Sequence, residues 1–142
     1  MDNNSKGFTI IELIVVIAII SVLATIIVIK VTAYINKSKD ASIKGNMASM
    51  ITSGVVFFNT SGNYTGLCTD TTNNFLAAFN SAISKQKSGG VSHCLATATE
   101  WAASVQINNP VGGGSSNGFW CVDSTGTKKE TLSAPGAVSV CP

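Results

Sequence analysis

The most prominent pattern in the chain is a block of apolar residues near its N-terminus. Between Phe8 and Ile29, 22 successive positions hold one charged residue, Glu12. As a helix rising 1.5 Å per residue, this block has a length of about 33 Å. That length matches the roughly 30 Å hydrocarbon core of a bilayer. The pattern therefore predicts a hydrophobic helix over residues 8–30 that is long enough to cross a membrane.

Beyond Lys30 the helical pattern continues with a different spacing. Apolar positions now recur at steps of three and four residues, as on one face of a helix. This pattern predicts an amphipathic second half of the same helix over residues 31–60, ending at the Ser61-Gly62-Asn63 stop signal. Its apolar stripe is expected to pack on a small domain, through Met47, Met50 or Ile51, Gly54 or Val55, and Phe58.

Residues 61–142 predict a small domain with a short helix and a sheet. The helix is expected over 75–83, after N-cap candidates at 71–74. Apolar and polar residues alternate over 100–107, which predicts a half-buried strand. A returning strand at 119–122, a turn at 123–126 and a further strand at 137–140 are also expected. The order of elements predicts an α+β fold, a long N-terminal helix packed on a small antiparallel sheet of three or four strands.

The composition excludes two classes of protein. Hydrophobic residues make up 45% and charged residues only 11% of the 142 positions, whereas disordered chains carry more charge and less apolar content. The net charge is +2, and all nine basic residues are lysines. Without arginine the chain lacks the bidentate contacts that basic nucleic-acid modules use.

Two simple explanations of the apolar block are a secretory signal peptide and a plain membrane anchor. The apolar part of a signal peptide is about 7–15 residues long and precedes a small-residue cleavage site, but this block is longer and no such site follows it. A plain anchor gives no reason for Glu12, because a carboxylate in lipid costs on the order of 2.5–3.5 kcal/mol. Glu12 is therefore a functional candidate that needs a partner.

The residues before the block suggest that partner. The segment 1–7 is short and polar and ends in Lys6-Gly7. Cleavage between Gly7 and Phe8 creates an α-amine on Phe8, one helical turn before Glu12. The amine of one chain and the carboxylate of a neighbour could then neutralise each other. Such a pair mainly sets register, because desolvation offsets much of the attraction.

The stretch KGFTIIELIVVIAIISVLATI resembles the class III signal peptide and N-terminal helix of a type IV pilin or pseudopilin. The Gly-Phe junction, the Thr-x-x-Glu spacing and the long apolar run carry the resemblance. It implies that residues 1–7 are a leader removed by a prepilin peptidase, which also N-methylates Phe8. It further implies that Phe8 and Glu12 direct assembly into a helical filament.

The resemblance also implies partners and a location. The subunit is expected in the bacterial inner membrane, bound by lipid and by the pilus assembly machinery. It then joins copies of itself in an extracellular filament for adhesion, twitching motility or DNA uptake, with DNA or a host surface as further candidate partners. A pseudopilin of a type II secretion system and a minor pilin are alternatives within the family. A membrane-anchored binding protein that never polymerises is an alternative outside it.

All four cysteines lie beyond the apolar block, within the predicted domain of residues 61–142. An even number in an exported domain favours two disulfides. Zinc is the rival, but the spacings contain no C-x-x-C pair. Of three possible connectivities we favour Cys68–Cys94 and Cys121–Cys141, because each closes a loop of ordinary size. Closing loops of that length contributes about 3 kcal/mol each.

Enzyme functions find little support in the sequence, so no catalytic residue, metal or cofactor is predicted. The single histidine, His93, neighbours Cys94, and adjacent residues rarely converge on one substrate. Acidic residues of the predicted domain are dispersed without paired spacing. Lysines that could contact DNA or another anionic surface are expected to be ordinary solvated side chains, at Lys85, Lys87, Lys128 and Lys129.

Overall fold

The computed structural model describes residues 7–109, 118–132 and 140–142. These residues divide into two compact units, 1–35 and 36–142. The strand expected over 137–140 lies outside the described residues except for Val140, which is not in a strand. The domain boundaries predicted from the sequence, at residues 7, 30 and 60, stay predictions.

The long helix predicted from the sequence is confirmed as α1, Ile10–Ser61. Within its apolar half, hydroxyl side chains return their hydrogen bonds to the helix itself: Ser21 Oγ donates to the Ile17 carbonyl and Thr25 Oγ1 to the Val22 carbonyl, each at 2.7 Å. Such bonds satisfy polar groups without water. The helix ends where Gly62 adopts φ +74° and donates to the Phe58 carbonyl, as expected for a glycine C-cap.

The described part of the second unit contains one further α-helix, and its cap explains where it begins. α2 runs over Asn74–Ile83, and Asn73 Oδ1 accepts a 2.7 Å hydrogen bond from the Phe75 N–H. This N-cap satisfies one of the donors that a helix leaves open at its start. A single 3-10 turn, η1 (Leu67–Thr69), lies between the two helices in sequence.

The sheet has four antiparallel strands in the order β1-β2-β3-β4. Their bounds are Ser92–Ala96, Trp101–Gln106, Phe119–Asp123 and Lys128–Thr131. The strands predicted at 100–107 and 119–122 correspond to β2 and β3, whereas β1 and β4 were not predicted. β4 follows a turn in which the Gly126 N–H donates to the Asp123 carbonyl and Gly126 has φ +86°. The predicted fold class, α+β with a small antiparallel sheet, is confirmed.

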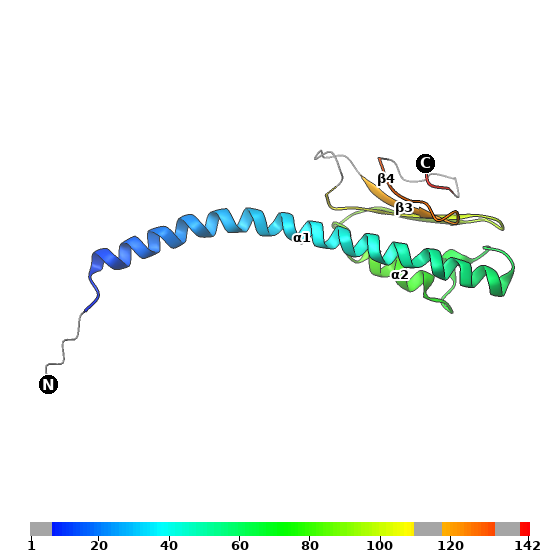
Figure 1. Cartoon of the computed structure of the whole chain (residues 1–142), viewed down its shortest axis with the longest axis horizontal. Helices are drawn as coiled ribbons and strands as arrows, with labels where there is room; N and C mark the ends of the chain where they lie inside the picture. The colour runs from blue at the N-terminus through cyan, green and yellow to red at the C-terminus, as the bar shows by residue number, and fades with distance from the viewer. Residues whose placement is uncertain (1–6, 110–117, 133–139) are drawn as a thin grey trace, which may run out of the picture. The chain divides into compact units, whose positions relative to one another are not determined.

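Helices and sheet of the second unit enclose one hydrophobic core. The sheet lies on one side of the later part of α1, and α2 runs alongside that helix (Figure 1). Phe75 of α2 meets Trp101 of β2 edge to face, with ring centroids 4.9 Å apart. Among the described side chains of α1, the buried positions are Asp40, Ile43, Met47, Met50 and Gly54.

Two residues of the predicted helix stripe lie outside this core. Val55 is 49% exposed, but its predicted alternative Gly54 is buried. Phe58 is 39% exposed, so the prediction that Phe58 belongs to the buried stripe was wrong. The stripe follows the steps from 43 to 47, 50 and 54, of which the last three positions were predicted. Phe58 packs at the edge of the unit, with its ring centroid 4.9 Å from that of Tyr64.

The expectation of a half-buried strand at 100–107 was also wrong, because all six residues of β2 are buried. β2 is a central strand with neighbours on both sides. Its helix-facing residues join the core. On the other face Ser104 is paired with Cys121, which is bonded to Cys141. A residue from the C-terminus therefore lies over the face that was expected to be exposed.

Two glycines of α1 provide a matched test of this packing. A Cβ on Gly54 would lie 2.9 Å from Trp101 Nε1, whereas nothing lies within 4 Å of one on Gly45. We expect Gly45→Ala to stabilise the helix by up to about 1 kcal/mol. Gly54→Ala should instead cost about 1–3 kcal/mol, because the indole must shift. Urea unfolding of the full chain in detergent micelles measures both. Equal effects of the two substitutions would contradict close packing of Trp101 on Gly54.

Candidate functional site

The candidate cleavage junction precedes the first turn of α1. Residues 7–9 are not helical, and the helix begins at Ile10. Gly7 is exposed, and apart from its chain neighbours no described residue has an atom within 4 Å of where its Cβ would stand. Phe8 is 86% exposed. The peptide bond between Gly7 and Phe8 is therefore sterically open to an enzyme, and the fold of this chain does not require glycine at position 7.

Thr9 and Glu12 form a reciprocal hydrogen-bonded pair at the start of α1. The Thr9 N–H and the Thr9 hydroxyl both donate to Glu12 Oε2, each at 2.8 Å. In return the Glu12 N–H donates to Thr9 Oγ1 at 3.3 Å. This is a capping box, in which a Thr N-cap and a Glu three residues later satisfy each other's backbone donors.

The capping box gives Thr9 a structural role that was not predicted from the sequence. Sequence reasoning treated the Thr-x-x-Glu spacing only as part of a family signature, although the same spacing predicts a capping box. In the structure the carboxylate sits beside the open N–H groups of the first helical turn, where negative charge is stabilised. Both donors from Thr9 meet the same oxygen, Oε2. No described residue donates a hydrogen bond to the other oxygen, Oε1.

The apolar half of α1 has no internal partner within the described residues of its unit. It includes an 18-residue window of mean hydropathy 3.0, none of which is buried. The side chains of its large apolar residues from Ile10 to Ile27 are 47% to 78% exposed. Exposed apolar surface on this scale marks a membrane or protein interface, and the helix is long and apolar enough to cross a membrane.

The N-terminal segment matches a known sequence family. Residues 2–28 match the prokaryotic N-terminal methylation motif. The chain thus carries the class III signal peptide of type IV pilins and pseudopilins. No curated protein and no solved structure matches the chain.

The methylation motif covers Gly7, Phe8 and Glu12, the three residues singled out from the sequence. The structure places them within one non-helical segment and the first turn of α1. Processing at Gly7-Phe8, methylation of Phe8 and an assembly role for Glu12 stay predictions of the motif.

The four cysteines form two disulfides in the second unit. Cys68 is bonded to Cys94, and Cys121 to Cys141, with Cα–Cα distances of 5.9 and 5.8 Å. The first joins the turn η1 to β1, which lies at an edge of the sheet. The second joins β3 to the C-terminus. Each bond therefore fastens a short or terminal segment to a regular element.

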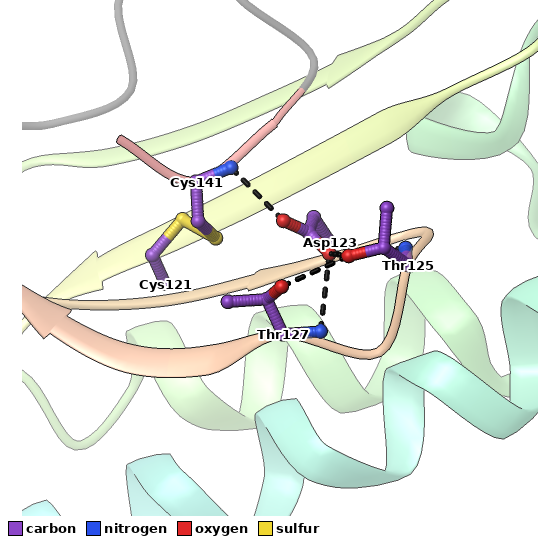
Figure 2. The surroundings of a disulfide bond; sticks show 5 residues. All are labelled: Cys121, Asp123, Thr125, Thr127 and Cys141. Atoms are coloured by element: carbon purple, nitrogen blue, oxygen red, sulfur yellow. Dashed lines mark hydrogen bonds between the residues drawn. A yellow bond between two sulfur atoms is a disulfide. The ribbon is translucent and has the colours of Figure 1, made fainter.

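A buried carboxylate lies beside the second disulfide. Asp123 is fully buried at the end of β3, and Figure 2 shows its carboxylate surrounded by donors. Asp123 Oδ1 accepts from the Thr125 N–H at 3.0 Å, the Thr125 hydroxyl at 2.6 Å and the Thr127 N–H at 3.1 Å. Asp123 Oδ2 accepts from the Cys141 N–H at 3.0 Å. One carboxylate thus organises the β3–β4 turn and holds the C-terminus.

These bonds stabilise the charged form of Asp123. Burial alone raises the pKa of the carboxyl, but hydrogen bonds from Thr125, the Cys141 N–H and the Thr127 N–H outweigh burial and lower that pKa. An unfolded aspartate has a pKa of about 3.9. Because the folded value is lower, the stabilisation is complete above about pH 4 and is lost as the pH falls through the folded pKa.

We therefore expect the free energy of unfolding to fall below about pH 4. Asp123→Asn should remove part of this decline. Part of it should remain, because hydrogen bonds from the Thr72 hydroxyl and N–H also lower the pKa of Asp70. Urea unfolding of both proteins between about pH 3 and pH 7 measures the difference. Identical pH profiles for the two proteins would contradict the role assigned to Asp123.

A second buried carboxylate that the sequence did not reveal joins α1 to the end of β2. Asp40 Oδ1 accepts from the Asn108 N–H and side-chain amide at 2.7 and 2.8 Å, and Asp40 Oδ2 accepts from the Asn109 N–H at 2.8 Å. The partners are 68 and 69 residues apart, so no local pattern predicts them. This cluster fixes where the chain leaves the sheet.

The remaining candidate residues lie on the surface. His93 is exposed on β1, and its neighbour Cys94 is held in a disulfide. The lysines considered for contacts with DNA are also exposed, at Lys85, Lys87, Lys128 and Lys129. Lys44 differs from them, because its Nζ lies 4.6 Å from the Trp120 ring centroid and 3.9 Å from Glu130 Oε2.

Proposed function

We propose that this chain is the structural subunit of a type IV pilus, which polymerises through its N-terminal helix into a surface filament. The observation that carries the proposal is the methylation motif at residues 2–28 at the head of a helix whose apolar surface is unburied. Lipid covers that surface while the subunit is stored in the inner membrane. Neighbouring helices cover it in the filament.

The geometry at the start of α1 supports a specific assembly contact. Removal of residues 1–7 converts the Phe8 nitrogen from an amide to an amine, which carries a positive charge after N-methylation. Glu12 Oε2 is held by Thr9, which leaves Oε1 for the Phe8 amine of a neighbouring subunit. In the apolar filament core, an unpaired charge is strongly destabilising, whereas a paired one is tolerated. Only the register that pairs Phe8 with Glu12 therefore avoids this penalty.

The disulfide-bonded unit, residues 36–142, is proposed to face outward in the filament. Two disulfides suit a small exported domain, because disulfides form and persist outside the cytoplasm. Adhesion, twitching motility and DNA uptake are functions of such filaments, and the outward surface of this unit is the part that contacts DNA or a host surface.

Two other roles within the family and one function outside it are the alternatives to this proposal. A pseudopilin of a type II secretion system or a minor pilin is processed in the same way, and is distinguished by its absence from the bulk of long surface filaments. A membrane-anchored binding protein needs no contact between Phe8 and Glu12. For that function, a Glu12 variant keeps full surface display.

Processing is the first step that the proposal requires. We expect the mature chain to begin at N-methylated Phe8, without residues 1–7, as measured by intact-mass and terminal-peptide mass spectrometry. Gly7→Val should retain the leader. Because nothing lies within 4 Å of the Cβ position at Gly7, that substitution leaves the fold intact and reports on recognition by the peptidase. A mature N-terminus other than Phe8 would contradict the proposal.

A further inference from the structure

The two disulfides share a sequence motif. Cys68 begins C-T-D-T-T, and Cys121 begins C-V-D-S-T, so each has an aspartate two residues later and a threonine four residues later. In both copies the aspartate Oδ1 accepts from the N–H and the hydroxyl of that threonine. The distances are 3.1 and 2.8 Å at Asp70, and 3.0 and 2.6 Å at Asp123. The motif therefore builds the same local turn beside each disulfide.

The second carboxylate oxygen distinguishes the two copies. Asp70 Oδ2 accepts from local side chains, the Asn73 amide at 2.6 Å and the Thr72 hydroxyl at 3.0 Å. Asp123 Oδ2 accepts instead from the Cys141 N–H, 18 residues away, at 3.0 Å. Asp123 is completely buried, whereas Asp70 is partly exposed. Only the second copy thus contacts the partner cysteine of its own disulfide.

The strand geometry directs both contacts to one residue. Cys121 and Asp123 are two positions apart on β3, so their side chains leave the same face of the sheet. Figure 2 shows Cys141 joined to Cys121 by the disulfide and to the carboxylate of Asp123 by a hydrogen bond. The hydrogen bond uses the N–H of Cys141 and not its sulfur, so a reduced Cys141 has the same donor to offer.

We propose that Asp123 is a positioning residue that selects Cys121 as the partner of Cys141 during oxidation. Four cysteines allow three connectivities, and before oxidation the C-terminus is not covalently held. Docking of the Cys141 N–H on Asp123 places the Cys141 thiol beside that of Cys121. The hydrogen bond raises the effective concentration of the Cys121 thiol near the Cys141 thiol. This pairing of Cys141 is therefore favoured over the two alternatives.

The oxidation itself needs a disulfide donor, for which oxidised glutathione serves as the probe. One cysteine thiolate attacks the donor disulfide and releases one glutathione thiol. The second cysteine thiolate then attacks the mixed disulfide, forms the Cys121–Cys141 bond and releases the second glutathione. Two electrons and two protons leave the protein thiols and are recovered in the two glutathione thiols.

Asp123→Asn is a selective test. The amide oxygen still accepts from Thr125 and Thr127, but the amide NH₂ replaces Oδ2 and opposes the Cys141 N–H, donor against donor. The full chain is equilibrated in detergent micelles with a glutathione redox buffer, and both disulfides are quantified by peptide mapping. We expect the equilibrium constant for Cys121–Cys141 to fall about tenfold or more, with an increase in mispaired Cys141. Cys68–Cys94 in the same molecules should be unchanged.

Asp70→Asn is the matched control, because it alters the same motif where no bond to the partner cysteine exists. It should leave both equilibrium constants within about twofold of wild type. Thr125→Val, which removes a donor from the turn alone, should also affect Cys121–Cys141 less than Asp123→Asn does. If Asp123→Asn does not fold, Asp123→Ser, which keeps one short acceptor for the turn, carries the same expectation.

Two results would overturn the proposal. One is an unchanged Cys121–Cys141 equilibrium in the variant at position 123. The other is an equal loss at both disulfides, because a purely structural role for Asp123 destabilises the whole unit rather than one pairing.

Discussion

Replacing Glu12 by alanine is expected to abolish filament assembly while leaving the 36–142 unit folded. The substitution removes the carboxylate that the proposed contact with the Phe8 amine requires, and the amine of each neighbouring subunit is left unpaired in an apolar core. Truncating one partner of such a pair costs about 3–5 kcal/mol, and the loss is repeated at every subunit. Sheared surface filaments, counted by electron microscopy and immunoblotting, should fall to background.

A second variant separates the charge of Glu12 from its role in the capping box. Glu12→Gln keeps an acceptor for the Thr9 N–H, since Gln also serves at this position of a capping box, but it carries no charge. We expect Glu12→Gln to lose filaments as well. Thr25→Val, which removes a hydroxyl bonded within the same helix, is the control and should assemble. Normal filaments from Glu12→Gln would mean that the cap, and not the charge, is what assembly needs.

The largest effect on stability is expected at Trp101. Its side chain is 1% exposed and lies between the Phe75 ring and Gly54. This side chain of β2 therefore contacts both α1 and α2. Trp101→Ala should cost about 3–5 kcal/mol, a large share of the 5–15 kcal/mol that stabilises a typical domain. Urea unfolding of the full chain in detergent micelles measures this loss.

Trp101→Phe is the matched variant, because it keeps an aromatic ring for Phe75 and loses only part of the volume. Its cost should be clearly smaller than that of the alanine variant. A loss below about 1 kcal/mol for Trp101→Ala, typical of surface positions, would contradict the central place of this side chain in the core.

The elements that the sequence predicted share a strong local signal. α1 and α2 have long or well-capped helical patterns, and the strands at 101–106 and 119–123 are apolar. β4 has the sequence KKET, which has low strand propensity. It forms a strand because the turn at Gly126 returns the chain along β3, pairing Val122 with Lys128. β1 likewise forms a strand because it pairs with β2. Apolar and polar residues alternate too weakly in its own sequence to predict a strand there.

The candidate site was predictable to the extent that it is local. Gly7, Phe8 and Glu12 lie within six residues of one another, and the Thr-x-x-Glu spacing contains the capping box. Asp123 is different, because its partner Cys141 is 18 residues away and the intervening chain has no periodic pattern. Its role depends on β3 and the C-terminus lying side by side, which only the folded structure provides.

The most direct test of the central claim is to shear filaments from the cell surface and identify their main protein by mass spectrometry. The proposed function predicts that this chain dominates the filament fraction and that its N-terminal peptide begins at methylated Phe8. Filaments composed of another protein, or this chain found only in the membrane with residues 1–7 attached, would contradict a role as the pilus subunit.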